Sequence, residues 1–225
     1  MPTQAERRAG TRAAVLRASV QVLVEAGTPG FTTPAVAARA GVAQGTVFVH
    51  FRTKAALLAA TVDSAVRAAV DEHAEAFVTR LATDPPPDRS ALVRRAVDAL
   101  WGAFTDDRVL AATEARVRAR TDEDLRRELG DSVQALHTTA ADVVALLLPE
   151  TFGVPGADYR DVAAIVVNAV QGRALATTYA PDPAADRELL DALVRVVDER
   201  YRTAGHVGVA AVEAAGVEAA GVESG

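Results

Sequence analysis

The sequence contains no cysteine, and aromatic side chains make up only 4% of its 225 residues. The absence of cysteine excludes disulfide bonds, thiolate metal sites and a cysteine nucleophile. No stretch reaches the roughly 20 apolar residues that a membrane-spanning helix needs. The first ten residues are polar and charged, unlike a secretion signal. We therefore expect a soluble cytoplasmic protein that does not enter a membrane and that can bury a sizeable core without disulfides or metal.

The motifs of common enzyme classes are also missing from the sequence. There is no nucleophile elbow, phosphate-binding P-loop, dinucleotide-binding glycine motif or HExxH zinc motif. His73 and Glu75 are too sparse to form a metal site, and most carboxylates fall at predicted helix starts or on solvated faces. The sequence therefore predicts a protein that is not an enzyme and uses neither a cofactor nor a metal.

Charge is divided unevenly along the chain, although the net formal charge is −6. Residues 1–60 carry seven basic and two acidic side chains, which gives +5, and the remaining 17 basic and 28 acidic side chains give −11. A basic end on an acidic body suits a protein that presents that end to a polyanion.

Apolar residues recur every three or four positions almost throughout, which predicts an all-α fold. A capping-box-like Thr121–Asp124 is expected to begin one long helix that Pro149 closes. Asp88 or Ser90 is expected to cap an earlier one. The other helices are expected over about 4–25, 34–40, 44–50, 54–81 and 106–119, and from 158 and 182 onward.

The most informative segment spans residues 31–54, which predicts two short helices joined by a tight turn. Thr33 is expected to cap the first helix, and Gly41 is expected to supply the left-handed turn residue. The second helix would turn Val47 inward and leave hydrogen-bonding side chains outward, as the recognition of base edges in a major groove requires. These outward residues are Gln44, Thr46 and His50.

The flanks of this segment suit contacts to phosphate. Thr32 and Thr33 lie at a predicted helix N-terminus, where free backbone N–H groups favour an anion. Lys54 lies at the start of another helix, and three arginines near the chain start could reach a nucleic-acid backbone or minor groove. These arginines are Arg7, Arg8 and Arg12.

Residues 11–58 resemble the DNA-binding segment of the TetR family. The order and spacing of these residues carry the resemblance: Gly27, Thr32-Thr33, Val36-Ala37, Ala40-Gly41-Val42, Gly45-Thr46, His50-Phe51 and Lys54. The resemblance implies a three-helix helix-turn-helix domain, here residues 1–54, and an all-helical ligand-binding and dimerisation domain, here residues 55–204. It also implies a homodimer that binds palindromic double-stranded operator DNA and is released by a small-molecule effector. Residues 205–225 read as a low-complexity flexible tail.

Three residues depart from the family pattern. Ala43 stands where a capping Ser or Thr is common, Phe48 replaces a common Tyr, and Ala55 replaces a frequent Glu. The segment and the resemblance together predict a set of DNA-binding residues, namely Thr32, Thr33, Gln44, Gly45, Thr46, Phe48, His50 and Lys54.

The C-terminal body offers candidates for the other two functions. A dimer interface is expected to include Ile165, Ala169, Gly172, Leu193 and Val197. A ligand pocket needs apolar walls with a few polar groups, and the candidates are Trp101, Phe104, Arg116, Gln134, His137 and Asn168.

A second interpretation of the sequence is a helical protein-interaction module whose basic end binds an acidic partner other than DNA. This alternative predicts no preference for palindromic duplexes over random DNA. The sequence does not distinguish a repressor from an activator, nor does it identify the operator or the effector.

Overall fold

The computed structural model describes residues 3–130, 160–200 and 202, and every regular element within these ranges is a helix. The all-α prediction is therefore confirmed. The chain divides into two compact units, one within Met1–Thr79 and Gly102–Leu136, the other within Arg80–Trp101 and His137–Gly225. In the described ranges, no helix is both long enough and apolar enough to cross a bilayer. The predicted tail at 205–225 lies outside the described residues.

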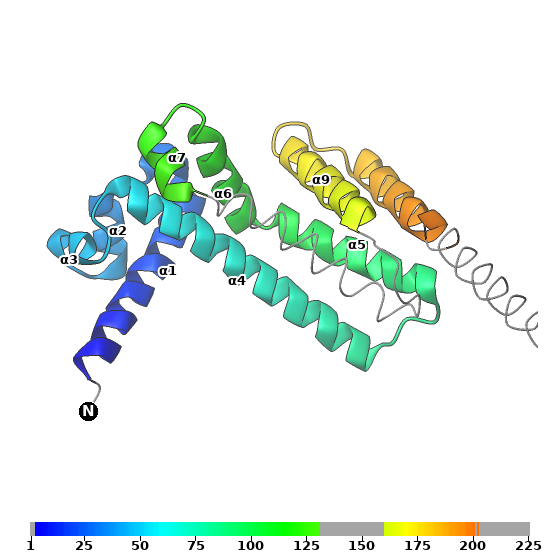
Figure 1. Ribbon diagram of the computed structural model, residues 1–225, viewed down its shortest axis with the longest axis horizontal. Coiled ribbons are helices and arrows are strands. Elements are labelled where there is room, and N and C mark those ends of the chain that lie inside the picture. The colour runs from blue at the N-terminus through cyan, green and yellow to red at the C-terminus, as the bar shows by residue number, and fades with distance from the viewer. Residues whose placement is uncertain (1–2, 131–159, 201, 203–225) are drawn as a thin grey trace, which may run out of the picture. The chain divides into compact units, whose positions relative to one another are not determined.

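The first unit is built from α1, α2, α3 and most of α4, together with α6 and α7 (Figure 1). The bounds are α1 (Gln4–Gly30), α2 (Thr33–Ala40), α3 (Gln44–His50), α4 (Lys54–Thr83), α6 (Asp107–Arg118) and α7 (Glu123–Leu129). The compact unit thus extends well past residue 54, and the functional boundary placed there remains a prediction.

The core of the first unit draws on α6 and α7 as well as on the N-terminal helices. Val15, Phe31, Val36 and Val62 are fully buried. They belong to one cluster that also includes residues of the later helices, namely Ala112, Ala115, Ala119, Leu125 and Leu129. The three alanines, two on α6 and one just after it, leave room for another helix to pack closely, so residues 107–129 form part of the same core.

Helix α1 bends near its end, where helix-breaking residues had predicted termination. Gly27 adopts φ 60°, and helical geometry then resumes as far as Gly30. The backbone N–H and the hydroxyl of Thr28 both donate to Glu114 Oε1, at 3.2 and 2.8 Å. This carboxylate on α6 satisfies polar groups that the bend frees, so the helix ends five residues later than predicted.

A buried hydroxyl pair links α1 to α4. Thr61 Oγ1 lies 2.8 Å from Ser19 Oγ, and the Ser19 hydroxyl donates to the Leu16 carbonyl at 2.8 Å. Both side chains are fully buried. Their hydrogen bonds remove the cost that two unpaired hydroxyl groups would otherwise impose on the core.

Two capping predictions need correction. The cap of α2 is Thr32 and not Thr33, because the Thr32 hydroxyl accepts from the Ala35 N–H at 3.2 Å. The cap of α7 is Asp122 and not Thr121, because its carboxylate accepts from the Leu125 N–H at 3.0 Å. In both cases the side-chain oxygen that caps the helix lies three residues before the N–H that donates to it. The observed cap therefore differs from the predicted one by one position.

The predicted long helix after Thr121 is also wrong over its described part. Helix α7 ends at Leu129, and Gly130 follows with φ 47° and ψ −135°. A residue with a Cβ rarely adopts this conformation, so the glycine stops a pattern that apolar periodicity alone would continue. The rest of the predicted helix lies outside the described residues.

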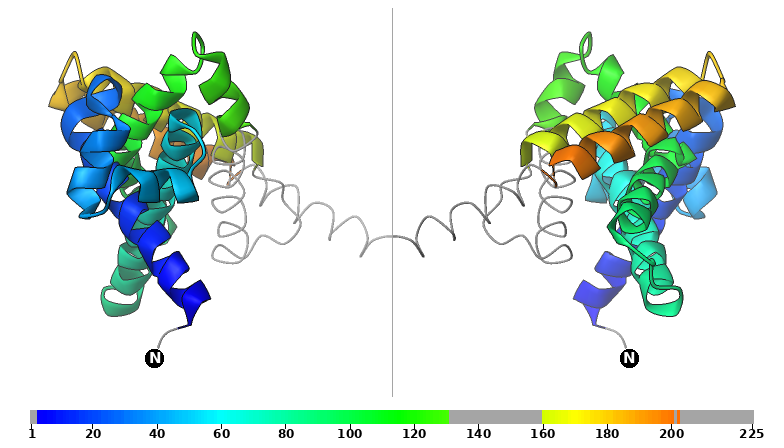
Figure 2. Two further views of the ribbon diagram at one scale, coloured as in Figure 1. Left: turned by 90° about the vertical axis from the view of Figure 1, so that its left-hand side faces the viewer. Right: turned by 90° about the vertical axis from the view of Figure 1, so that its right-hand side faces the viewer.

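The second unit contains most of α5 (Arg89–Thr105), α9 (Arg160–Thr177) and a last described helix over residues 183–200. Helix α9 and residues 183–200 lie side by side in Figure 1 and in the right-hand view of Figure 2, and Arg173 Nε is 2.5 Å from Asp186 Oδ1. Asp88 caps α5 by accepting from the Ala91 N–H, while the Ser90 hydroxyl donates to Asp198. Asp88 is therefore the cap of the two that the sequence offered.

Candidate nucleic-acid interface

A tight turn at Gly41 sets the angle between α2 and α3. Gly41 adopts the left-handed conformation with φ 68°, and the Val42 N–H donates to the Ala37 carbonyl at 3.0 Å. This is the hydrogen bond that closes a helix ending in a glycine. The predicted turn residue and the predicted bounds of α3, Gln44–His50, are both confirmed.

Helix α3 divides sharply into an inner and an outer face. Val47 is 1% exposed, and Phe51, just after the helix, is 5% exposed. Gln44 and Gly45 are exposed, whereas Thr46 and His50 are half-buried. The predicted candidates therefore lie away from the core, where they can meet a ligand, with two of them partly covered.

The sequence reasoning missed the most exposed apolar side chain of this helix. Val49 is 66% exposed and its neighbour Phe48 is 46% exposed. The signal was available, since a residue two positions from the buried Val47 lies about 200° around a helix. Val49 was not among the predicted DNA-binding residues because a valine side chain forms no hydrogen bonds.

The start of α3 lacks a side-chain cap. Ala43 occupies the N-cap position with extended backbone angles, and no side chain there accepts a hydrogen bond. Relative to Ser or Thr, this loses about 1 kcal/mol of helix stability. The first N–H groups of α3 are therefore free of an internal cap, as the departure from the family pattern predicted.

The two threonines before α2 differ in what they offer to a phosphate. Thr32 is exposed, although its hydroxyl already accepts the capping hydrogen bond. Thr33 is only 8% exposed. A contact from Thr32 is thus compatible with its position, whereas the side chain of Thr33 presents little surface.

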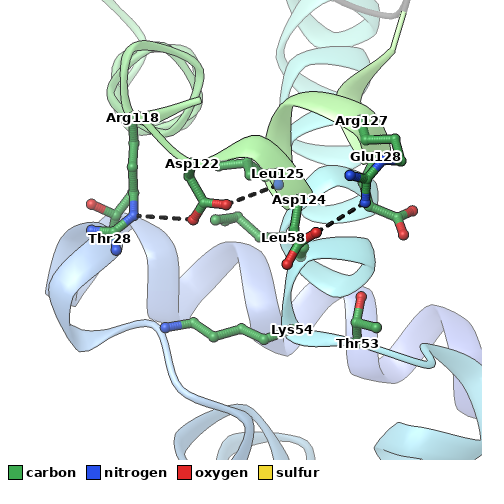
Figure 3. Close-up of a pocket in the computed structure, with 11 residues that line it drawn as sticks. Thr28, Thr53, Lys54, Leu58, Arg118, Asp122, Asp124, Leu125, Arg127 and Glu128 are labelled. Atoms are coloured by element: carbon green, nitrogen blue, oxygen red, sulfur yellow. Dashed lines mark hydrogen bonds and ion pairs between the residues drawn. The ribbon is translucent and has the colours of Figure 1, made fainter. Parts of the chain in front are cut away.

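Lys54 lies at the start of α4 and lines a pocket of about 430 Å³. Figure 3 shows this pocket between the end of α1, the start of α4 and the α6–α7 region. Arg118 is 3.8 Å from Asp122, and Arg127 is 2.9 Å from Asp124. Within the described part of the chain, Lys54 has no such carboxylate partner, so its charge is available to an external anion.

Other cations near α3 are held in different ways. The Arg12 guanidinium lies 5.1 Å from the centre of the Phe51 ring, a cation–π contact that places it beside the end of α3. Arg39 instead forms a two-pronged ion pair with Glu25. Its hydrogen bonds lower the pKa of the Glu25 carboxyl below its ordinary value. Arg12 is therefore the better candidate for a phosphate contact.

The predicted ligand-binding residues are divided between the two compact units. Phe104 and Arg116 belong to the first unit, whereas Trp101 and Asn168 belong to the second. Asn168 is exposed, and its amide donates to the Ala164 carbonyl at 2.7 Å. Gln134 and His137 lie outside the described residues.

Arg116 is unusual among these candidates because part of its charged guanidinium is buried. Its Nε and one terminal nitrogen are inaccessible and have no hydrogen-bond partner among the described residues. Burial lowers the pKa of the guanidinium, and attraction to Asp63 on α4 partly opposes this shift. Arginine nevertheless stays protonated in proteins, so a partly buried positive charge lies here with two of its nitrogens unbonded among the described residues.

Comparison with known proteins agrees with this geometry. Residues 15–61 match the family model for bacterial regulatory proteins of the tetR family. The matched segment runs from within α1 to within α4 and contains the complete α2–turn–α3 unit. The chain carries the DNA-binding helix-turn-helix of the TetR family of transcriptional regulators.

Relatives and solved structures extend the likeness beyond the helix-turn-helix. An uncharacterised HTH-type transcriptional regulator of Mycobacterium tuberculosis is 28% identical over 87% of this chain and 96% of its own length. A TetR-family regulator from Rhodococcus sp. shares the fold with a TM-score of 0.59, at 22% identity over 84% of this chain and 97% of its own. FadR from Bacillus subtilis, solved with stearoyl-CoA, gives a TM-score of 0.55 at 15% identity over 81% and 97%. Such regulators are ordinarily not enzymes.

Proposed function

We propose that this TetR-family regulator is a homodimeric repressor that binds a palindromic operator through α3 and leaves it when a small-molecule effector binds. The DNA-binding part rests on one observation. The outer face of α3 is exposed, and two cations lie near its C-terminal end, Arg12 on the ring of Phe51 and Lys54 at the start of α4. Cations beside a recognition helix position it on the phosphate backbone.

The dimer part is supported by an apolar stripe on α9. Ile165 is 57% exposed, Leu175 is 37% exposed and Tyr179, just past the helix, is 76% exposed. These residues and the exposed Gly172 recur at helical spacing, so they form one face. Isolated exposed apolar residues need no explanation, but an aligned stripe favours a protein interface.

Two residues of the predicted dimer interface are too buried to contact a second chain. Leu193 and Val197 are 5% and 4% exposed, so they pack inside their own unit. On the same helix Val196 is 44% exposed and is the better candidate. A dimer is also favoured on functional grounds, since one short recognition helix reads too few base pairs for useful specificity.

The effector part is supported by Arg116. Two buried nitrogens of this guanidinium have no hydrogen-bond partner among the described residues, which is costly to the fold, and an anionic ligand group would supply the missing hydrogen bonds. The FadR relative was solved with stearoyl-CoA, a ligand that carries phosphate groups. We infer that the effector of this protein presents a carboxylate or phosphate to Arg116.

Replacing Arg116 by methionine is therefore expected to stabilise the ligand-free protein. Removing a poorly compensated buried charge and keeping the volume apolar raises stability by about 1–4 kcal/mol in comparable cases. Urea unfolding followed by circular dichroism measures the change. Arg67→Met, at an exposed cation on α4, is the control and should change stability by less than about 0.5 kcal/mol. A loss of stability in Arg116→Met would show that the guanidinium already has a structural partner.

The test of operator binding is selection of duplexes from a random DNA library, followed by gel shift of the selected sequence at two salt concentrations. We expect a palindromic sequence that binds far more tightly than random DNA. Weak, salt-sensitive binding without an enriched sequence would instead favour the interaction-module alternative. A reporter gene with the selected operator across its promoter distinguishes repression from activation.

Replacing Lys54 by alanine should weaken binding to all DNA sequences about equally. Because one phosphate contact is lost, the slope of log K against log salt should become shallower by about 1. Thr46→Ala should instead change which bases are preferred, while Arg67→Ala, on the exposed side of α4, should change neither. An unchanged salt slope in Lys54→Ala would remove Lys54 from the interface.

A further inference from the structure

The part of α3 that points directly away from the core, at Gly45 and Val49, carries no side chain that forms hydrogen bonds. Gly45 and Val49 each lie two positions from the buried Val47, on opposite sides of it in sequence, so both are turned directly away from the core. They are four residues apart and therefore adjacent on the same face. The polar residues Thr46 and His50 lie to one side of Gly45 and Val49 and are half-buried.

The space in front of Gly45 and Val49 is open. A Cβ added to Gly45 would meet no atom within 4 Å, and Val49 is 66% exposed. Without a side chain at position 45, the first turn of α3 can approach a ligand surface closely. A ligand that approaches the helix at Gly45 would also contact the two methyl groups of Val49, one helical turn further on.

The charge around α3 selects the kind of surface. Residues 1–60 carry a net +5, Arg12 lies on the ring of Phe51, and Lys54 is available to an anion. A polyanion is therefore the complementary partner. The apolar patch itself is small, since only Val49 and the 46% exposed Phe48 contribute large side chains. A nucleic-acid duplex that exposes one apolar group among its polar base edges would match both the positive charge and the small apolar patch.

The major groove offers one such group, the C5 methyl of thymine. We propose that Val49 contacts a thymine methyl and thereby specifies an A·T pair in each operator half-site. This inference rests on the proposed operator binding by α3. It assigns specificity to a residue that forms no hydrogen bond, alongside the polar candidates Gln44, Thr46 and His50.

A double-mutant cycle between protein and DNA tests the contact directly. Each thymine of the selected half-site is replaced in turn by deoxyuridine, which removes only the methyl group. For wild-type protein, one replacement is expected to weaken binding about four-fold, the value for one methyl-sized apolar contact. Val49→Ala should bind the thymine operator more weakly by at least a similar factor and should lose almost nothing further on the same replacement.

The control is Val117→Ala, which shortens a valine of similar exposure, 59%, on α6. It should keep wild-type affinity and the full sensitivity to deoxyuridine. Circular dichroism confirms that both variants are folded. If no single replacement weakens wild-type binding, or if Val49→Ala stays as sensitive as wild type, the inference is wrong while operator binding stands. Failure to select any operator would overturn the proposed function and this inference together.

Discussion

A glutamate in place of Ile165 should leave a folded monomer that binds the selected operator at least about 100-fold more weakly than wild type. Linking two reading helices makes the second binding event intramolecular, and the resulting gain in affinity is about 10²- to 10⁴-fold. Ile165 is 57% exposed in the single chain, so glutamate there costs little within one protomer. In a dimer, the same charge would lie buried and unpaired.

Sedimentation velocity and gel shift on the same samples measure this effect. Val117→Glu is the matched control, because Val117 is 59% exposed on α6 and receives the same change. We expect the control to stay dimeric with unchanged affinity. A dimeric Ile165→Glu protein with intact operator binding would place the interface elsewhere than on α9.

Replacing Phe31 by alanine should destabilise the first unit by about 3–5 kcal/mol, the usual cost of removing a buried phenyl ring. Phe31 is fully buried in the link between α1 and α2, within the core cluster that supports the helix-turn-helix. Typical domains are stable by only 5–15 kcal/mol. The substitution should thus consume a large share of the total stability.

Urea unfolding monitored by far-ultraviolet circular dichroism gives the magnitude. Phe48→Ala removes the same ring from a position that is 46% exposed on α3, and it should change stability by less than about 0.5 kcal/mol. Equal losses of unfolding free energy in the two variants would show that burial of Phe31 does not stabilise the core.

Local features of the helix-turn-helix were predictable from the sequence because short-range chemistry determines them. Gly41 was expected at the left-handed turn and adopts φ 68°, and Ala43 was expected to leave α3 without a cap. The error at α2 was a single position, Thr32 for Thr33. Neighbouring threonines have equal capping chemistry, and only the backbone angles decide between them.

Long-range contacts were beyond the reach of the sequence. Thr28 and Glu114 are 86 positions apart, and no local sequence pattern predicts that they form a hydrogen bond. The cation–π contact of Arg12 with Phe51 likewise depends on the packing of α1 against the end of α3. The burial of Arg116 could not be predicted either, since a sequence shows that an arginine is present but not which of its nitrogens lack a partner among the described residues.

The hydrogen bonds between Thr28 and Glu114, together with the packing of alanines at α6, limit how this helix-turn-helix could be moved into another protein. A fragment cut soon after residue 61 would keep α2 and α3 but would lose the carboxylate that caps the bend in α1. It would also expose the surface covered by Ala112, Ala115 and Ala119. Chimaeras that exchange operator specificity between such regulators should therefore carry α6 and α7 along with the reading head, or graft only the outward residues of α3 onto an intact host.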